Sequence, residues 1–196
     1  RAGSRPLLEA VPAGLPCRTS RDSVDSIHTW VREHVRHPHL AGFVAPDRAL
    51  SEEGLIDSGV GWCNEQARVF IALCGVAGIP ARLCFLFHSN ERCGHTATEV
   101  WLEGKWAFCD VTFGVLVMLP TGEPASGLDL QGHYRALAHE AYRAPLTDYL
   151  AHVRPEFDHV PGWGLADRPE PNLGGELLHA IGVCNYLPEG VERMEG

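Results

Sequence analysis

Three side chains have the types and the order that nucleophilic catalysis requires: Cys63, His95 and Asp110. A thiol attacks only as its thiolate, and a helix N-terminus favours the negative charge. Histidine can hold the thiol's proton and later deliver it to a leaving group, because its pKa lies near neutrality. A carboxylate can orient the imidazole. These residues therefore predict a nucleophile, a general base that later acts as an acid, and an orienting group, in that order.

The nucleophile needs a helix that begins at Cys63. In "GWCNEQARVFIALCGVAGIPAR", residues 61–82, apolar residues recur at intervals of three and four: Ala67, Phe70, Ile71 and Cys74. This spacing predicts a helix over about residues 63–77. Gly78 can end it in a left-handed conformation, and Pro80 prevents it from resuming. We expect Cys74 to face the core as an inert thiol, and Cys63 to lie where the helix end can stabilise a thiolate.

The other two residues need a hairpin. The sequence "PARLCFLFH" (80–88) predicts a strand, and residues 95–115 predict two strands joined near 103–105, with Gly104 in the turn. The residue that faces His95 then lies roughly at position 112 or 113. Diagonal neighbours across two strands lie about 7 to 8 Å apart, which places Asp110 within diagonal reach of His95.

The flanking segments are predicted to pack around this core. Residues 21–37 have helical spacing, with Asp22 or Ser23 as the candidate cap, and residues 38–60 look irregular. Beyond Pro120 the composition changes, and residues 130–153 look helical until Pro145 breaks the helix. We therefore expect one domain over 1–196, with a core at about 54–114 and a C-terminal extension at 120–196.

Two blocks of sequence resemble the transglutaminase-like superfamily. The first block matches at Gly61, Cys63, Ala67 and residues 78–82. The second matches at His95, Glu99, Val100, Trp106, Asp110 and Thr112. The resemblance covers residues 54–114. The chain departs from the family at Ala97, where an aromatic residue is common, and at Val111, where proline is common, which suggests an altered substrate cleft.

The resemblance implies a papain-like α+β fold, in which the nucleophile helix packs on an antiparallel sheet and helical or irregular segments extend both ends. An amide or related acyl donor would form a thioester on Cys63, without a cofactor. The backbone N–H of Cys63 is the expected oxyanion donor. Trp62, Glu99 and Trp106 are candidates for the substrate cleft, although a solvated strand face is the alternative for Glu99.

Three functions fit this chemistry. A peptidase or amidase is preferred, because no site for a second substrate is evident in the sequence. A transglutaminase-type transferase that forms amide bonds in a biosynthetic pathway is the close alternative, and the third is an inactive binding module. The triad does not decide between water and an amine as acceptor, because cleft shape and water exclusion do.

A metal site is a weaker hypothesis. Cys93 lies two residues from His95, and Cys109 adjoins Asp110, so zinc-binding residue types are present. Neighbouring residues of a strand point to opposite faces, however, so Cys109 should face away from Asp110. We expect no bound metal, and we expect the remaining histidines to be solvated at the surface. They are His34, His37, His39, His133, His139, His152, His159 and His179.

Composition limits the possible partners. The 196 residues are 45% hydrophobic and carry a formal net charge of -9. Such acidity argues against nucleic acid and anionic membranes, and favours a neutral or cationic peptide, protein or small-molecule substrate. No apolar run is long enough to span a bilayer. The odd count of seven cysteines, without a CxxC pair, predicts free thiols and a cytoplasmic location, although the chain begins at Arg1 and a removed targeting segment is compatible with it.

Overall fold

A computed structural model describes most of the first three quarters of the chain and one strand near its end. The described residues are 5–16, 18–41, 47–88, 93–131, 133–134, 136–138, 140–145, 147–148 and 180–184. For residues 39, 87–88, 93–94 and 180–184 the backbone alone is described. Within this part of the chain, no helix is long and apolar enough to cross a membrane.

The described elements are helices and one antiparallel sheet. The helices are α1 (Pro6–Gly14), α2 (Ser20–His34), the short 3-10 helix η1 (Pro38–Leu40), α3 (Glu52–Ser58), α4 (Cys63–Val76) and α5 (Gly127–Gln131). The strands are β1 (Ala81–His88), β2 (Cys93–Leu102), β3 (Lys105–Asp110), β4 (Val115–Leu116) and β5 (Ala180–Cys184). Their order in the sheet is β4-β3-β2-β1-β5. This confirms the predicted α+β class.

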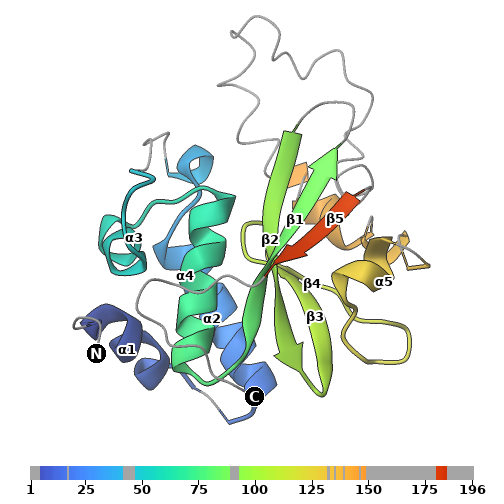
Figure 1. Ribbon diagram of the computed structural model, residues 1–196, viewed down its shortest axis with the longest axis horizontal. Coiled ribbons are helices and arrows are strands. Elements are labelled where there is room, and N and C mark those ends of the chain that lie inside the picture. Colours follow the sequence, from blue (N-terminus) through green and yellow to red (C-terminus); the bar gives the residue numbers. More distant parts are fainter. Residues whose placement is uncertain are drawn as a thin grey trace, which may run out of the picture.

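The sheet separates two apolar layers. Helices α1 to α4 lie on one side of it and α5 on the other (Figure 1). The larger core cluster joins α2 and α4 to the side chains of Val100, Leu102, Ala107 and Cys109. The smaller cluster, on the opposite face, contains Ala97, Phe108 and Tyr142. The residues of β2 and β3 therefore alternate between the two layers, as strand geometry requires.

The helix that carries Cys63 has the predicted bounds to within a residue. It begins at Cys63 and ends at Val76, and Gly78 follows with φ +74. The N–H of Ile79 donates to the carbonyl of Cys74 at 2.8 Å, which satisfies a carbonyl of the last turn. Cys74 is fully buried, as expected.

Two predictions about the segment before this helix are wrong. Thr19, not Asp22 or Ser23, caps α2: its hydroxyl accepts from the N–H of Asp22, and the Asp22 side chain accepts from the N–H of Thr19. Residues 38–60 contain the short helices η1 and α3, where irregular chain was expected. Each is too short to show a helical period, but α3 buries Leu55 completely.

The predicted hairpin is present and its register is defined. Trp101 faces Trp106, the pairing runs to Thr98 opposite Cys109, and Glu103 and Gly104 form the turn with positive φ. Extending this register places position 112 opposite His95, as predicted. The second strand ends earlier than expected, because residues 111–114 form a turn between β3 and β4, with Gly114 at φ +70.

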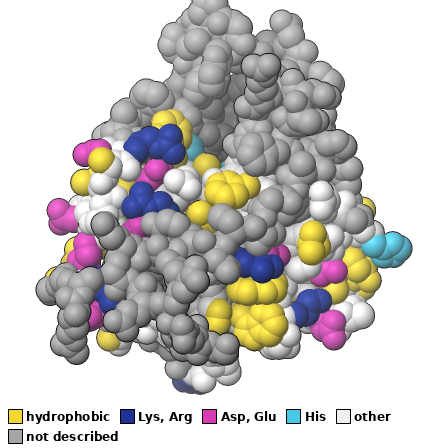
Figure 2. Space-filling view, viewed as in Figure 1, with side chains coloured by type: hydrophobic (Ala, Val, Ile, Leu, Met, Phe, Trp, Pro, Cys, Tyr) yellow, Lys and Arg dark blue, Asp and Glu magenta, His cyan; other side chains and the backbone are white. Residues whose placement is uncertain are grey.

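The C-terminal extension adds helices and a strand. Beyond α5, residues 136–138, 140–145 and 147–148 are helical, and β5 pairs with the outer edge of β1. On the face drawn in Figure 2, hydrophobic side chains reach the surface over the lower end of the sheet, beside basic and acidic ones. Trp101 and Leu128 are the most exposed of the large hydrophobic side chains that are described, at 41% and 64%.

Candidate active site

Cys63 lies at the first position of α4. Trp62 is the N-cap residue, and its side chain makes no capping hydrogen bond. The first N–H groups of a helix have no partner within the helix, so those of α4 face the Cys63 end with their partial positive charge. Cys63 is partly exposed, whereas Cys74, Cys84 and Cys109 are buried. Among the thiols whose side chains are described, Cys63 is thus the accessible one.

His95 and Asp110 are in direct contact. The Nε2 atom of His95 lies 2.7 Å from Oδ2 of Asp110. The Asp110 side chain is fully buried and that of His95 is 9% exposed. Because Nε2 is bound to Asp110, the hydrogen bond between His95 and Cys63 uses the other ring nitrogen, Nδ1.

Cys63 contacts His95 near the point where the pairing between β2 and β3 ends. His95 lies on the sheet face opposite α4, because it shares the pleat of Ala97. Pairing between β2 and β3 stops at Thr98, whose hydroxyl donates to the carbonyl of Cys109 at 2.7 Å. Beyond Thr98, β2 does not pair with β3.

The part of β2 beyond Thr98 supplies a hydrogen bond to the sulfur of Cys63. The N–H of Trp101 donates to the carbonyl of Pro80, toward β1. Since N–H groups alternate sides along a strand, the N–H of Thr96 points the other way, toward the side where β3 no longer pairs. There it donates to Cys63. The end of the β2–β3 ladder thus provides a donor for a thiolate.

The charges of Cys63 and His95 stabilise each other. Burial alone would raise the pKa of the Cys63 thiol, but the charge of His95 and the hydrogen bonds from His95 and Thr96 together lower it. Burial alone would lower the pKa of His95, but the carboxylate of Asp110 and the sulfur of Cys63 raise it to about 10. The two shifts favour the thiolate–imidazolium pair over the neutral thiol and imidazole.

Asp110 accepts hydrogen bonds on each of its oxygens. The N–H of Phe113 donates to Oδ1 at 3.2 Å, and the hydroxyl of Tyr142 donates to Oδ2 at 2.5 Å. Burial would raise the pKa of Asp110, but the charge of His95 and these hydrogen bonds hold it below its usual range. The carboxylate therefore stays charged inside the protein.

His28 and Tyr142 are site residues that the sequence did not reveal. His28 of α2 donates from Nε2 to the backbone carbonyl of Asp110 at 3.0 Å, and burial lowers its pKa, so it is neutral. Tyr142 is 32 residues from Asp110, in a segment that was interpreted only as extension. Neither belongs to a local pattern, because only the tertiary packing brings them to Asp110.

A polar network fixes the start of α4 against the turn that follows Asp110. The amide nitrogen of Gln66 donates to the carbonyl of Val35 at 2.8 Å, and its oxygen accepts from the hydroxyl of Thr112 at 2.7 Å. Both contacts are buried, so each hydrogen bond avoids the cost of an unpaired polar group. Gln66 thereby connects the helix of Cys63 to the turn that positions Asp110.

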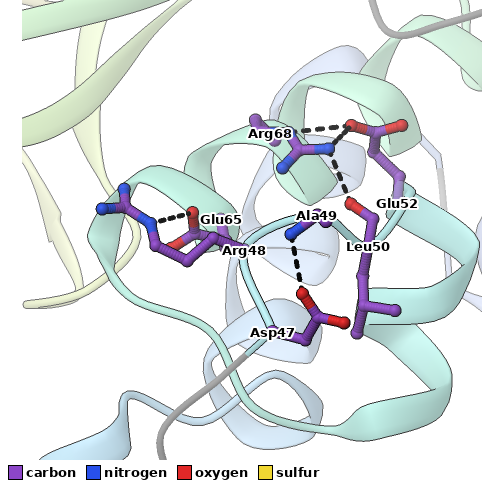
Figure 3. Close-up of polar contacts among 7 residues, drawn as sticks. All are labelled: Asp47, Arg48, Ala49, Leu50, Glu52, Glu65 and Arg68. Carbon is purple, nitrogen blue, oxygen red and sulfur yellow. Dashed lines mark hydrogen bonds and ion pairs between the residues drawn. The ribbon is translucent and has the colours of Figure 1, made fainter.

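Two arginines connect α4 to α3 and to the segment before it (Figure 3). Arg48 donates from Nε to Oε1 of Glu65 at 3.2 Å, and Glu65 is 1% exposed. Arg68 binds Oε1 of Glu52 at 2.7 Å and the carbonyl of Leu50 at 3.0 Å. Both carboxylates are buried, and the contacts hold the first two turns of α4 in place.

Trp62 directly precedes Cys63 in the chain. Its ring packs edge-on against that of His37, with centroids 5.2 Å apart. His37 is 6% exposed, so the prediction of a solvated surface histidine is wrong at this position. His34 and His133 are exposed, as predicted. The side chains of His39, His139, His152, His159 and His179 lie outside the described residues.

The structure places Glu99 and Trp106 elsewhere. Each lies four residues along its strand from His95 or Asp110, a distance of about 13 Å. Glu99 is fully buried: it binds Arg82 at 2.6 Å and accepts from the N–H of Gly127 at 2.7 Å. The guanidinium of Arg82 also lies 3.8 Å above the ring of Trp106. A solvated strand face is therefore wrong for Glu99, and both residues belong to an ion pair and cation–π contact that anchor α5.

Cys109 faces away from Asp110, as predicted from strand alternation. It belongs to the apolar cluster on the α4 side, whereas Asp110 faces Tyr142. Burial raises the pKa of the Cys109 and Cys74 thiols, which keeps both protonated. Among the described residues, no group of three or more histidine, cysteine or acidic side chains could hold a metal ion. The side chain of Cys93 is outside the described part.

Comparison with known families agrees with this geometry. Residues 10–111, just over half of the chain, match the transglutaminase-like superfamily. The chain belongs to the transglutaminase-like superfamily. The match includes Cys63, His95 and Asp110, and it begins well before the residues 54–114 on which the sequence resemblance was based. The transglutaminase-like region therefore includes α2 and α3.

Two solved structures that are similar to part of this chain belong to larger proteins. The "putative cysteine protease" of Cytophaga hutchinsonii has 25% identity and a TM-score of 0.42, over 55% of this chain and 36% of that one. A "putative protease" of Parabacteroides distasonis has 14% identity and a TM-score of 0.39, over 54% of this chain and 22% of that one. The chain thus spans about a third or less of each protein's length. No curated protein matches it.

Proposed function

We propose that the protein is a cysteine-dependent acyl-transfer enzyme that hydrolyses amide bonds, as a peptidase or amidase. The observation that carries the proposal is the position of His95, which bonds to Asp110 at 2.7 Å through one ring nitrogen and to Cys63 through the other. Membership of the transglutaminase-like superfamily supports it. We assign Cys63 as nucleophile, His95 as base and acid, and Asp110 as the group that orients His95.

In the first half of the reaction, the Cys63 thiolate attacks the carbonyl carbon of the amide. A carbon–sulfur bond forms and the carbonyl electrons move to oxygen. The backbone N–H of Cys63 supplies a hydrogen bond to this oxyanion, a contribution worth about 2.7 to 4 kcal/mol in comparable sites. When the carbon–nitrogen bond breaks, the imidazolium of His95 gives its Nδ1 proton to the leaving amine. A thioester remains on Cys63.

In the second half, His95 is neutral and acts as a base. A water molecule attacks the thioester carbonyl and gives its proton to His95, and the carbon–sulfur bond breaks. The products are a carboxylic acid and the restored thiolate–imidazolium pair. Asp110 stabilises the imidazolium in both halves, and its charge is held by the hydrogen bonds from Phe113 and Tyr142.

Water is the proposed acceptor because it needs no binding site of its own to reach the thioester. Transfer to an amine uses the same acyl-enzyme and differs only in the second half. Trp62, which lies next to Cys63 and packs on His37, is the residue we expect to contact the acyl donor. The net charge of -9 favours a neutral or cationic peptide or amide as that donor.

Intact-mass spectrometry tests the proposal. The protein is incubated with a panel of peptides and small amides, with and without added amine, and the mass of the protein and of the products is followed. We expect an acyl adduct that maps to Cys63 and is released as a free acid. Release as a new amide would instead establish the transferase.

Two variants serve as controls for this measurement. Cys63→Ser should form no thioester, and Cys74→Ser should form it normally, because Cys74 is buried in the core. Iodoacetamide near neutral pH should modify Cys63 before the other described thiols, and His95→Ala should remove this preference. Equal reactivity of Cys63 and the buried thiols in the wild type would contradict the proposal.

A further inference from the structure

Tyr142 is the one side chain from outside the family match that bonds to Asp110 among the described residues. Its hydroxyl lies 2.5 Å from Oδ2, the same oxygen that binds Nε2 of His95 at 2.7 Å. Tyr142 is 1% exposed. A buried tyrosine hydroxyl that meets a buried carboxylate has to donate, because the carboxylate can only accept.

Tyr142 also packs against the surroundings of His95. Its ring contacts that of Phe113, with centroids 5.7 Å apart, and Phe113 contacts the ring of His95 at 5.1 Å. Phe113 in turn donates its N–H to Oδ1 of Asp110. Tyr142 therefore acts on the His95–Asp110 pair in two separable ways, through its hydroxyl and through its ring.

We propose that Tyr142 is a positioning residue for the reaction of Cys63. The hydroxyl of Tyr142 shares Oδ2 of Asp110 with His95, and it limits how tightly Asp110 holds the His95 proton. This inference rests on the proposed function. An oxygen that accepts two hydrogen bonds divides its negative charge between them, so each donor is held less strongly than it would be alone. Through Tyr142, the C-terminal extension would thus adjust how readily His95 gives up its proton.

Such adjustment matters because His95 has two opposite tasks. It has to keep its proton beside the thiolate, and then release that proton to the leaving group. General acids work best when their pKa is not far above the working pH. Asp110 alone would make the imidazolium a poor donor, and the hydroxyl of Tyr142 counters this effect.

Other titratable groups surround the same atoms and have to stay constant in the test. They are Cys63 of α4, Cys84 of β1, Cys109 of β3 and His28 of α2, together with His95 and Asp110 themselves. Tyr142→Phe removes the hydroxyl and keeps the ring, so it changes none of them. Tyr142→Leu removes both the hydroxyl and the aromatic ring.

The experiment measures the alkylation rate of Cys63 by iodoacetamide from pH 5 to 11, with the modified peptide quantified by mass spectrometry. A thiolate paired with an imidazolium gives a first rise in rate, and loss of the imidazolium proton gives a second rise at higher pH. We expect Tyr142→Phe to move the second rise upward by about one pH unit, because Asp110 then holds His95 alone. Circular dichroism and thermal unfolding check that the variant is folded.

The outcomes separate the inference from the proposed function. If the alkylation rate of wild-type Cys63 shows no rise below the pH range in which ordinary thiols ionise, the proposed function itself is overturned. A wild-type protein with two rises, and a folded Tyr142→Phe variant with the same two, would overturn the inference alone. If Tyr142→Leu shifts the second rise but Tyr142→Phe does not, packing is the cause and the role of the hydroxyl is wrong.

Discussion

At the scale of single residues, the site is defined by three groups that change each other's protonation. Burial raises the pKa of Cys63, whereas His95 and Thr96 lower it, and their combined effect is the larger one. Burial lowers the pKa of His95, whereas Asp110 and Cys63 raise it, and the combined effect of these two partners is again larger. The partners of each group thus decide its charge, and burial serves to strengthen their effect.

These shifts predict a pH range for activity. As the pH rises, Cys63 becomes a thiolate below its ordinary value of 9.0, and His95 keeps its proton until about pH 10. Acylation needs both the thiolate and the imidazolium, so its rate should rise through the pKa of Cys63 and fall through that of His95. The measurement is kcat/KM against pH for a donor found by the mass-spectrometric screen. A single rise centred at pH 9, without a fall, would show that the two groups are not coupled.

Asp110→Asn isolates the charge of the orienting group. The amide keeps nearly the same shape, but it no longer stabilises the imidazolium, so the pKa of His95 should fall and the alkaline limb should move to lower pH. Cys63 should react more slowly at neutral pH by at least about tenfold, since about one unit of pKa corresponds to that factor. Rate measurements on Cys63 with iodoacetamide check this, and unchanged thermal unfolding would exclude a folding defect.

At the scale of elements, the start of α4 depends on the absence of a side chain at Gly61. A Cβ atom there would lie 2.8 Å from Cβ of Glu65 and 3.2 Å from Cγ1 of Val35. Neither neighbour is the free end of a flexible chain, so the helix start would have to move. The Gly-x-Cys pattern of the sequence therefore has a packing reason: Gly61 lets the chain pass close beneath the first turn.

Gly61→Ala should lower the free energy of unfolding by about 1 to 3 kcal/mol and slow the alkylation of Cys63, because it displaces the thiol from His95 and Thr96. Gly75→Ala is the matched control on the same helix, since nothing lies within 4 Å of its added Cβ. That control should be neutral or stabilise by up to about 1 kcal/mol. Chemical denaturation and alkylation rates measure the two effects, and equal stability of both variants would contradict the packing explanation.

The ion pair of Arg82 and Glu99 connects the sheet to α5. Arg82→Met would leave Glu99 buried with only the N–H of Gly127, and losing one partner of a buried pair costs about 3 to 5 kcal/mol. Adding Glu99→Gln should recover part of this loss, because the amide is neutral and still accepts from Gly127. Arg21→Met breaks the exposed pair with Glu103 and should cost less than about 1 kcal/mol. Thermal unfolding ranks the three variants, and a cost for Arg82→Met no larger than that for Arg21→Met would count against the buried pair.

At the scale of the whole molecule, the sequence was sufficient for those parts of the site that local patterns specify. The helical period gave the start of α4 at Cys63, and the turn at Gly104 gave the register that brings Asp110 diagonally opposite His95. Both depend on residues close in the chain. Their geometry follows from the periods of helix and strand.

Contacts between distant segments could not be predicted in this way. Tyr142 meets Asp110, and His28 holds its carbonyl, only because helices from both ends of the chain pack on the same sheet. Glu99 had the alternation of a surface residue, but Arg82 neutralises it and lets it be buried. The sequence alone does not show which residues are in contact, so it does not distinguish a buried, paired carboxylate from a solvated one.

The reactivity of Cys63 is conditional on assembly, because the groups that lower its pKa belong to β2 and not to its own helix. In a chain in which α4 has not docked on the sheet, Cys63 lacks its contacts with His95 and Thr96 and is an ordinary thiol. The reactive thiol therefore exists only in the folded protein. Alkylation of Cys63 consequently reports on the native state.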